Sequence, residues 1–144
     1  MEDEGNWLSI EQMDQFKELE KLSDDVWTEV DSWPIFARNT VGKQLVAAID
    51  SAGANCVEGD GRFHHRDTLN FYYFARGSTK EAAYWVRRAK ARKITSEETA
   101  NKFLGRIEHS RRWINTLISQ RRSYASHVHE EPAAYIVKSH HLSS

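Results

Sequence analysis

The cations and tyrosines between residues 66 and 88 are the side chains with the clearest potential for chemistry. Most of them are separated by three, four or seven positions, so a helix would gather them within a limited arc of one face. Arginine and lysine neutralise phosphates, and a tyrosine ring stacks on an exposed base. The pattern favours an RNA- or DNA-binding strip that contains Arg66, Tyr73, Lys80, Tyr84, Arg87 and Arg88, extended by Arg92, Arg121 and Arg122.

Helix ends offer a second explanation for part of this basic excess. Cations near a helix C-terminus are stabilised by its partial negative charge, each by about 0.3–1 kcal/mol. Lys90, Arg92 and Lys93 would follow the end of one helix, and Arg121 and Arg122 would close another. Ordinary helix termination therefore competes with phosphate binding as the reason for these residues.

Enzyme chemistry is the least supported class of function. The sequence has no Walker loop, CxxC pair, HExxH motif or nucleophile elbow. Cys56 is predicted on an apolar helix face, where a thiol is inert. We expect no cofactor and no metal site. His64 and His65 are adjacent at a helix start and would point in different directions. The other clustered histidines follow no helical period: His127, His129, His140 and His141.

The length and charge of the chain point to a single domain with two unlike halves. Its 144 residues fit one globular domain, and the net charge of −1 conceals a split. Residues 1–31 hold eleven acids and two bases, a charge of −9, whereas residues 62–122 hold fifteen bases and five acids, a charge of +10. A single cysteine, an acidic N-terminus and no long apolar run predict a cytoplasmic protein without a membrane span.

Apolar residues recur at helical spacing through most of the chain, which predicts an all-α fold. The breaks between the periodic segments are short, and short links force consecutive helices to run antiparallel. We expect an up-down-up-down four-helix bundle over residues 9–124, with helices at about 9–33, 39–58, 67–92 and 96–124, an acidic N-terminal tail at 1–8 and a C-terminal tail at 125–144.

Capping residues mark the predicted helix ends. Ser9 with Gln12, and Thr95 with Glu98, match the capping box that begins a helix. Gly59 is predicted to end the second helix in a left-handed conformation.

Trp113 lies off the apolar stripe of the fourth helix and must be covered by something. A contact with a neighbouring helix or with the tail is one explanation. The other is a subunit interface formed by Trp113 with Arg106 and Leu117, because Trp and Arg are enriched at interface cores. Trp7 and Trp27 are further candidates for such an interface.

Glu58 is predicted at the C-terminal end of a helix, where the helix dipole disfavours an acid. A cation must offset it, and the candidates are Arg62, Arg76 and Arg111. We favour a buried structural salt bridge over a catalytic role for this carboxylate.

Two segments of the chain carry a family resemblance. Residues 51–62 (SAGANCVEGDGR) and 71–81 (FYYFARGSTKE) resemble the bacterial four-helix bundle proteins encoded in intervening sequences of 23S ribosomal RNA. The sequence departs from the family pattern at Gly53, where proline is common, and at Cys56, where isoleucine is common. The matching positions are Asn55, Glu58, Gly59, Gly77, Ser78 and Glu81.

The resemblance implies a cytosolic bundle that assembles as a ring-like homopentamer and has no established catalytic activity. The same superfamily includes the accessory variability determinant of diversity-generating retroelements, a basic pentamer that binds nucleic acid and its reverse transcriptase. By this likeness Gly77 and Ser78 are expected to permit a close helix approach, and Asn55 and Glu58 to hold the second helix against the third. Gly59, Arg62, Arg76 and Glu81 complete the expected structural signature.

Two functions from different classes follow from the sequence. The leading hypothesis is a non-enzymatic oligomer that binds RNA or DNA through the basic strip. The alternative is a protein-interaction adaptor, for example for a reverse transcriptase, whose acidic first helix meets basic helices of a neighbour or partner. In either case we expect the acidic and basic helices to lie side by side, so that part of the +10 is neutralised within the subunit.

Overall fold

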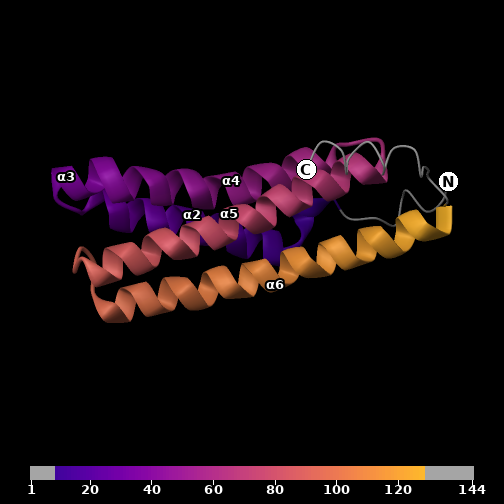
Figure 1. Cartoon of the computed structure of the whole chain (residues 1–144). Coiled ribbons are helices and arrows are strands. Elements are labelled where there is room, and N and C mark those ends of the chain that lie inside the picture. The colour runs from indigo at the N-terminus through magenta and orange to yellow at the C-terminus, as the bar shows by residue number, and fades with distance from the viewer. Residues whose placement is uncertain (1–8, 129–144) are drawn as a thin grey trace, which may run out of the picture.

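The computed structural model describes residues 9–128, which contain helices and turns and no strand. Four long helices dominate, as the sequence predicts (Figure 1). The helices are η1 (Ile10–Gln12), α2 (Asp14–Asp31), α3 (Ile35–Ala37), η2 (Arg38–Gly42), α4 (Lys43–Asp60), α5 (His65–Ala91) and α6 (Glu97–Val128).

The first helix is shorter than predicted because the chain breaks at Met13. The backbone amide of Ser9 donates to Gln12 Oε1 at 3.0 Å, so the predicted capping pair is present. This pair caps only the turn η1, since Met13 is extended at φ −79° and ψ 139°. The amide of Ile10 donates to Asp60 Oδ2 at 3.2 Å, which ties the turn to the end of α4.

The second helix is longer than predicted at both ends. It begins after Pro34, passes through a π-helical turn at η2 and continues without interruption into α4. Gly42 lies at a close approach to α2, since a Cβ placed there would lie 2.5 Å from Val30 Cγ1.

Gly59 does not end the second helix in a left-handed cap, as the sequence led us to expect. No glycine among the described residues has a positive φ, and α4 continues to Asp60. A Cβ on Gly59 would lie 3.0 Å from both Phe71 Cβ and Tyr72 Cε1, and its carbonyl accepts a 2.8 Å bond from Thr68 Oγ1. Glycine is needed here because α4 and α5 approach closely.

The turn between α5 and α6 is capped one residue later than predicted. Ser96 Oγ accepts from the Thr99 amide at 3.0 Å, so Ser96 caps α6. Thr95 Oγ1 instead donates to Glu29 Oε2 at 2.7 Å, which fastens the turn to the end of α2. Lys93, with φ 59°, supplies the left-handed residue in this turn.

The four long helices form a bundle in which each contacts two neighbours. Helix α5 packs between α4 and α6, and α2 packs between α4 and α6 on the other side. Within residues 9–128 no Cα of α2 lies within 8 Å of a Cα of α5, so these two helices are diagonal. Figure 1 shows α4, α5 and α6 side by side over most of their lengths, with α2 behind them.

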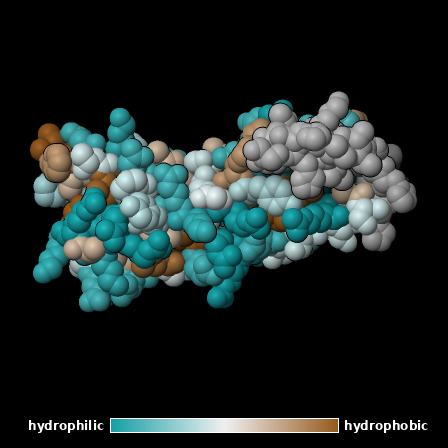
Figure 2. Space-filling view, viewed as in Figure 1, coloured by the Kyte–Doolittle hydropathy of each residue, from teal (hydrophilic) through white to brown (hydrophobic). Residues whose placement is uncertain are grey.

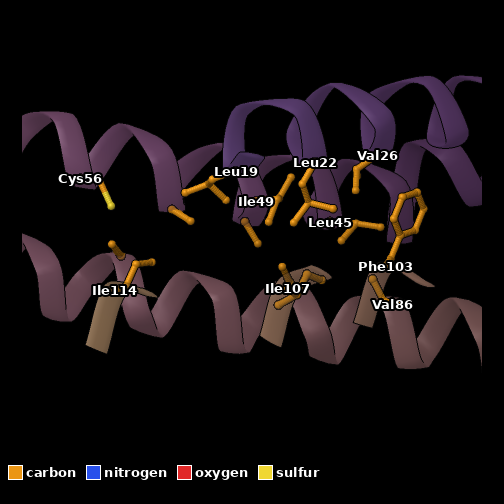
Figure 3. Close-up of a cluster of buried hydrophobic side chains, with 14 of the residues drawn as sticks. Leu19, Leu22, Val26, Leu45, Ile49, Cys56, Val86, Phe103, Ile107 and Ile114 are labelled. Atoms are coloured by element: carbon orange, nitrogen blue, oxygen red, sulfur yellow. The ribbon is translucent and has the colours of Figure 1, made fainter. Parts of the chain in front are cut away.

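Apolar side chains from all four helices meet along the bundle axis. Figure 3 shows the side chains of α2 and α4 pointing toward those of α5 and α6. Leu19, Ile49 and Ile114 are fully buried, and Cys56 lies in the same core. Burial raises the pKa of the Cys56 thiol to about 12, so the thiol stays protonated.

Candidate nucleic-acid interface

The C-terminal half of α5 and the residue after it carry a group of solvent-accessible cations, here called the cation cluster: Lys80, Arg87, Arg88 and Arg92. Lys80, Arg87 and Arg92 are exposed, and Arg88 is half-buried. The Arg88 guanidinium lies 5.8 Å from the ring centroid of Tyr84, which is 46% exposed. No carboxylate of the described residues lies within 4.0 Å of a cation in this cluster.

Tyr73 is already occupied by arginines of the same chain. Arg122 donates to the Tyr73 hydroxyl from Nε at 2.9 Å and from Nη2 at 2.6 Å. The guanidiniums of Arg76 and Arg122 lie 5.3 Å and 5.4 Å from its ring centroid. Arg76 also donates to Asn115 Oδ1 at 3.0 Å. Tyr73 is therefore a half-buried junction between α5 and α6, with its hydroxyl bonded and two guanidiniums near its ring. Tyr84 is more exposed and has one guanidinium near its ring.

The nine residues expected to bind nucleic acid therefore do not form one patch. Arg92 follows the end of α5, whereas Arg121 and Arg122 lie near the end of α6, and antiparallel helices place these at opposite ends of the bundle. Arg121 Nη1 lies 2.9 Å from His65 Nδ1. Arg66, beside the start of α5, is half-buried and has a partner.

The acidic helix α2 lies beside only one of the two basic helices: it packs against α6, as expected, but lies across the bundle from α5, contrary to expectation. Helix α2 carries seven acids and two lysines, and it lies diagonally across the bundle from α5. Among the described residues one ion pair joins α2 to α6, between Arg106 Nη1 and Asp25 Oδ2 at 2.8 Å, and none joins α2 to α5. The charge of the cation cluster is therefore not neutralised by α2.

Part of the basic character of α6 is neutralised locally. Glu108 accepts from Arg111 Nε at 2.9 Å and from Arg112 Nε at 3.1 Å. These hydrogen bonds, that from Arg111 first, lower the pKa of Glu108 to about 2. The i, i+3 and i, i+4 spacing of the three residues was the available signal for this cluster, which our reading of the sequence missed.

The side chains of the signature residues divide into half-buried groups and surface groups. Ser51 Oγ of α4 and Ser78 Oγ of α5 share a 2.9 Å hydrogen bond, and Asn55 Nδ2 donates to Ser51 Oγ at 2.9 Å. Ser78 therefore connects α5 to α4, whereas the hydrogen bonds of Asn55 stay within α4 and do not join the two helices as expected. Gly77 does not mediate a close approach, since a Cβ there would meet nothing within 4 Å.

Glu58 pairs with a cation, but the pair is not buried. Arg62 Nη2 donates to Glu58 Oε2 at 2.7 Å, and the two side chains are 41% and 55% exposed. Of the three candidate partners Arg62 is the one found, and an exposed pair contributes little to stability. Glu81 likewise lies at the surface, where it accepts from Trp85 Nε1 at 3.2 Å.

The residues considered for a subunit interface are used within the chain. Trp113 is 8% exposed and Leu117 is 7% exposed. The rings of Trp113 and Phe16 of α2 lie 6.4 Å apart, and Arg106 is held by Asp25. A contact with a neighbouring helix therefore covers Trp113. Trp27, at 63% exposed, is the surface tryptophan of α2, and Trp7 lies outside the described residues.

The described residues contain no group of three or more metal-ligating side chains. His64 packs against Phe63 and His65 against Tyr124, with centroids 4.8 Å and 4.4 Å apart. The side chains of the histidines considered in the C-terminal stretch lie outside the described part. No helix of residues 9–128 has a segment long and apolar enough to cross a membrane.

The four packed helices define the class of protein, an all-α four-helix bundle. The chain belongs to the family of 23S rRNA-intervening sequence proteins, whose family model matches residues 11–116. The matched region holds α2, α4, α5 and most of α6, and includes the cation cluster but not Arg121 and Arg122. No curated protein matches the chain.

Proposed function

We propose that the protein is a non-enzymatic module that binds RNA or DNA through the cation cluster of α5. The observation that carries the proposal is that four cations and Tyr84 share one accessible region without a carboxylate partner. Phosphate oxygens are the ligands that such a region attracts.

Proximity of like charges strengthens this argument. Arg87, Arg88 and Arg92 lie within about two helical turns, well inside the screening length of about 10 Å at 0.1 M salt. They repel one another in the free protein, and a polyanion relieves that repulsion. In Figure 2 hydrophilic residues predominate on the visible face of the bundle, with hydrophobic patches between them.

Two groups with strongly raised pKa values belong to the core and not to the cation cluster. Cys56 and Tyr72 both have pKa values raised to about 12, mainly by burial in the core. Each is thereby kept protonated and away from solvent, which suits a structural role.

A matched pair of double variants tests the proposal. Lys80→Gln/Arg87→Gln removes two positive charges from the cation cluster. Lys17→Gln/Lys43→Gln removes two charges from exposed positions on α2 and α4. We expect RNA binding at low salt to weaken in the first variant and to persist in the second. Equal loss in both would show that only net charge matters and would contradict the assignment to α5.

The second candidate is an adaptor in a ring-like homo-oligomer, such as a homopentamer, or on a protein partner such as a reverse transcriptase. The diagonal placement of acidic α2 and basic α5 favours it, because a head-to-tail arrangement would bring unlike faces together. In this case Arg87→Glu/Arg88→Glu lowers the oligomer mass in light scattering. Unchanged assembly with lost RNA binding would contradict the adaptor. With either function we propose a cytoplasmic location.

A further inference from the structure

A stripe of five residues with heptad spacing runs along α5 beside the cations. The intervals between its members are three, four, three and four, so they follow one face of the helix. We call this the α5 stripe, and it consists of Phe74, Gly77, Glu81, Tyr84 and Arg88.

The aromatic members of the stripe are exposed and braced. Phe74 is 60% exposed and Tyr84 is 46% exposed. Phe71 packs edge-on against Phe74, with centroids 6.0 Å apart, and Trp85 packs edge-on against Tyr84 at 5.0 Å. Ten residues separate the two rings, which is about 15 Å along a helix axis. Both rings thus keep accessible surface along the same stripe, and the Arg88 guanidinium lies near the Tyr84 ring.

Gly77 leaves the helix surface open between the two rings. It is exposed, and a Cβ at this position would meet nothing within 4 Å. Glycine inside a helix is destabilising by about 1 kcal/mol relative to alanine, and no close contact within the described chain explains its presence. The missing side chain gives an external ligand direct access to the backbone of α5.

Lys80 and Arg87 flank the stripe on one side. Each lies three residues after a stripe member, Lys80 after Gly77 and Arg87 after Tyr84, so both project from the same edge. Phosphates can therefore follow this edge while bases lie over the stripe. Glu81 is then on the base side, where a carboxylate can accept a hydrogen bond from a base amino group.

Resting on the proposed function, we infer that this surface binds single-stranded nucleic acid in preference to a duplex. Stacking on Phe74 and Tyr84 requires bases with free faces, which a single strand offers and a duplex does not. The opening at Gly77 accommodates the nucleotide between the two rings.

The test compares an unstructured oligouridine with a blunt RNA duplex of equal length by fluorescence anisotropy on the full chain. Tyr84→Ala and Phe74→Ala should each weaken single-strand binding by between about 5-fold and about 100-fold. Duplex binding should not change. Phe36→Ala, which removes an aromatic that is 78% exposed on α3, is the matched control and should change neither.

Gly77→Leu adds a side chain at an exposed position where a Cβ would meet no described atom within 4 Å, so we expect the fold to tolerate it. It should weaken single-strand binding while the thermal unfolding temperature is maintained or raised. Equal affinity for both RNAs, with no effect of Phe74→Ala and Tyr84→Ala, would overturn the inference and leave the electrostatic proposal standing. No binding of either RNA at low salt would overturn both.

Discussion

Arg122 of α6 donates two hydrogen bonds to the hydroxyl of Tyr73 on α5, at 2.9 Å and 2.6 Å. The contact joins residues 49 positions apart and uses a tyrosine and an arginine that the sequence assigned to ligand binding. Tyr73 and Arg122 therefore join α5 to α6, whereas the residues of the cation cluster remain available at the surface.

Tyr73→Phe should destabilise the fold slightly without weakening RNA binding. The variant loses the hydroxyl acceptor but keeps the ring that Arg76 and Arg122 contact. A hydrogen bond typically contributes about 0.5–1.5 kcal/mol to the free energy of unfolding, and we expect the low end of this range at an exposed site. Urea unfolding measures the change, and anisotropy measures the affinity. A large loss of RNA affinity in this variant would show that Tyr73 itself contacts the ligand.

Alanine substitutions at Gly77 and at Gly59 should change the stability of the protein in opposite directions. Gly77→Ala should stabilise the protein by about 0.5–1 kcal/mol, because the new methyl group would meet no atom of the described residues within 4 Å. Gly59→Ala should destabilise it by about 1–3 kcal/mol, because the methyl group would crowd Phe71 and Tyr72 at 3.0 Å. The thermal unfolding temperatures of the two variants test this prediction. If both temperatures rise, or both fall, the prediction is wrong.

Glu108 predicts a pH dependence of stability. Its hydrogen bonds to Arg111 and Arg112 lower its pKa from 4.5 to about 2 in the folded state. A depressed carboxyl pKa stabilises the fold above the unfolded value and loses this contribution as the pH falls from about 4.5 to about 2. Because the side chain is 43% exposed, the effect is below about 1 kcal/mol. The free energy of unfolding should therefore change less between pH 7 and pH 2 in Glu108→Gln than in the wild type. An equal change in both proteins would contradict this prediction.

Cys56 should be unreactive in the native protein. It has no exposed surface, and burial raises its pKa to about 12. A thiol reagent should modify it slowly under native conditions and rapidly in denaturant. Fast modification of the folded chain would show that the α4 face opens readily.

The helical fold and most of the core follow from the sequence because apolar periodicity reports which face of a helix is buried. The predicted helix ends were less accurate than the predicted core, because contacts between helices determine where each helix ends. The Asp60 bond to Ile10 accompanies a break at Met13, and the approach of Phe71 requires Gly59 without ending the helix. Trp113 looked misplaced on a single-helix wheel because Phe16 of α2, which covers it, is distant in sequence.

The site was less predictable because a helical wheel shows which residues share a face but not which neighbours engage them. Arg122 occupies Tyr73, and Arg121 contacts His65, so two expected cations serve contacts within the chain. The diagonal position of α2 and α5 also depends on the order of helices around the bundle. Periodicity within one helix does not encode that order.

The salt dependence of RNA binding tests the central claim most directly. The logarithm of the binding constant is plotted against that of the salt concentration for the wild type, Lys80→Gln/Arg87→Gln and Lys17→Gln/Lys43→Gln. Each lost phosphate contact makes this negative slope shallower by about 0.7 for a single strand, so the slope of Lys80→Gln/Arg87→Gln should be shallower than that of the wild type by about 1.4. The control should keep the wild-type slope. A wild-type protein that binds no RNA at low salt, or equal slopes in all three proteins, would contradict a phosphate-binding role for α5.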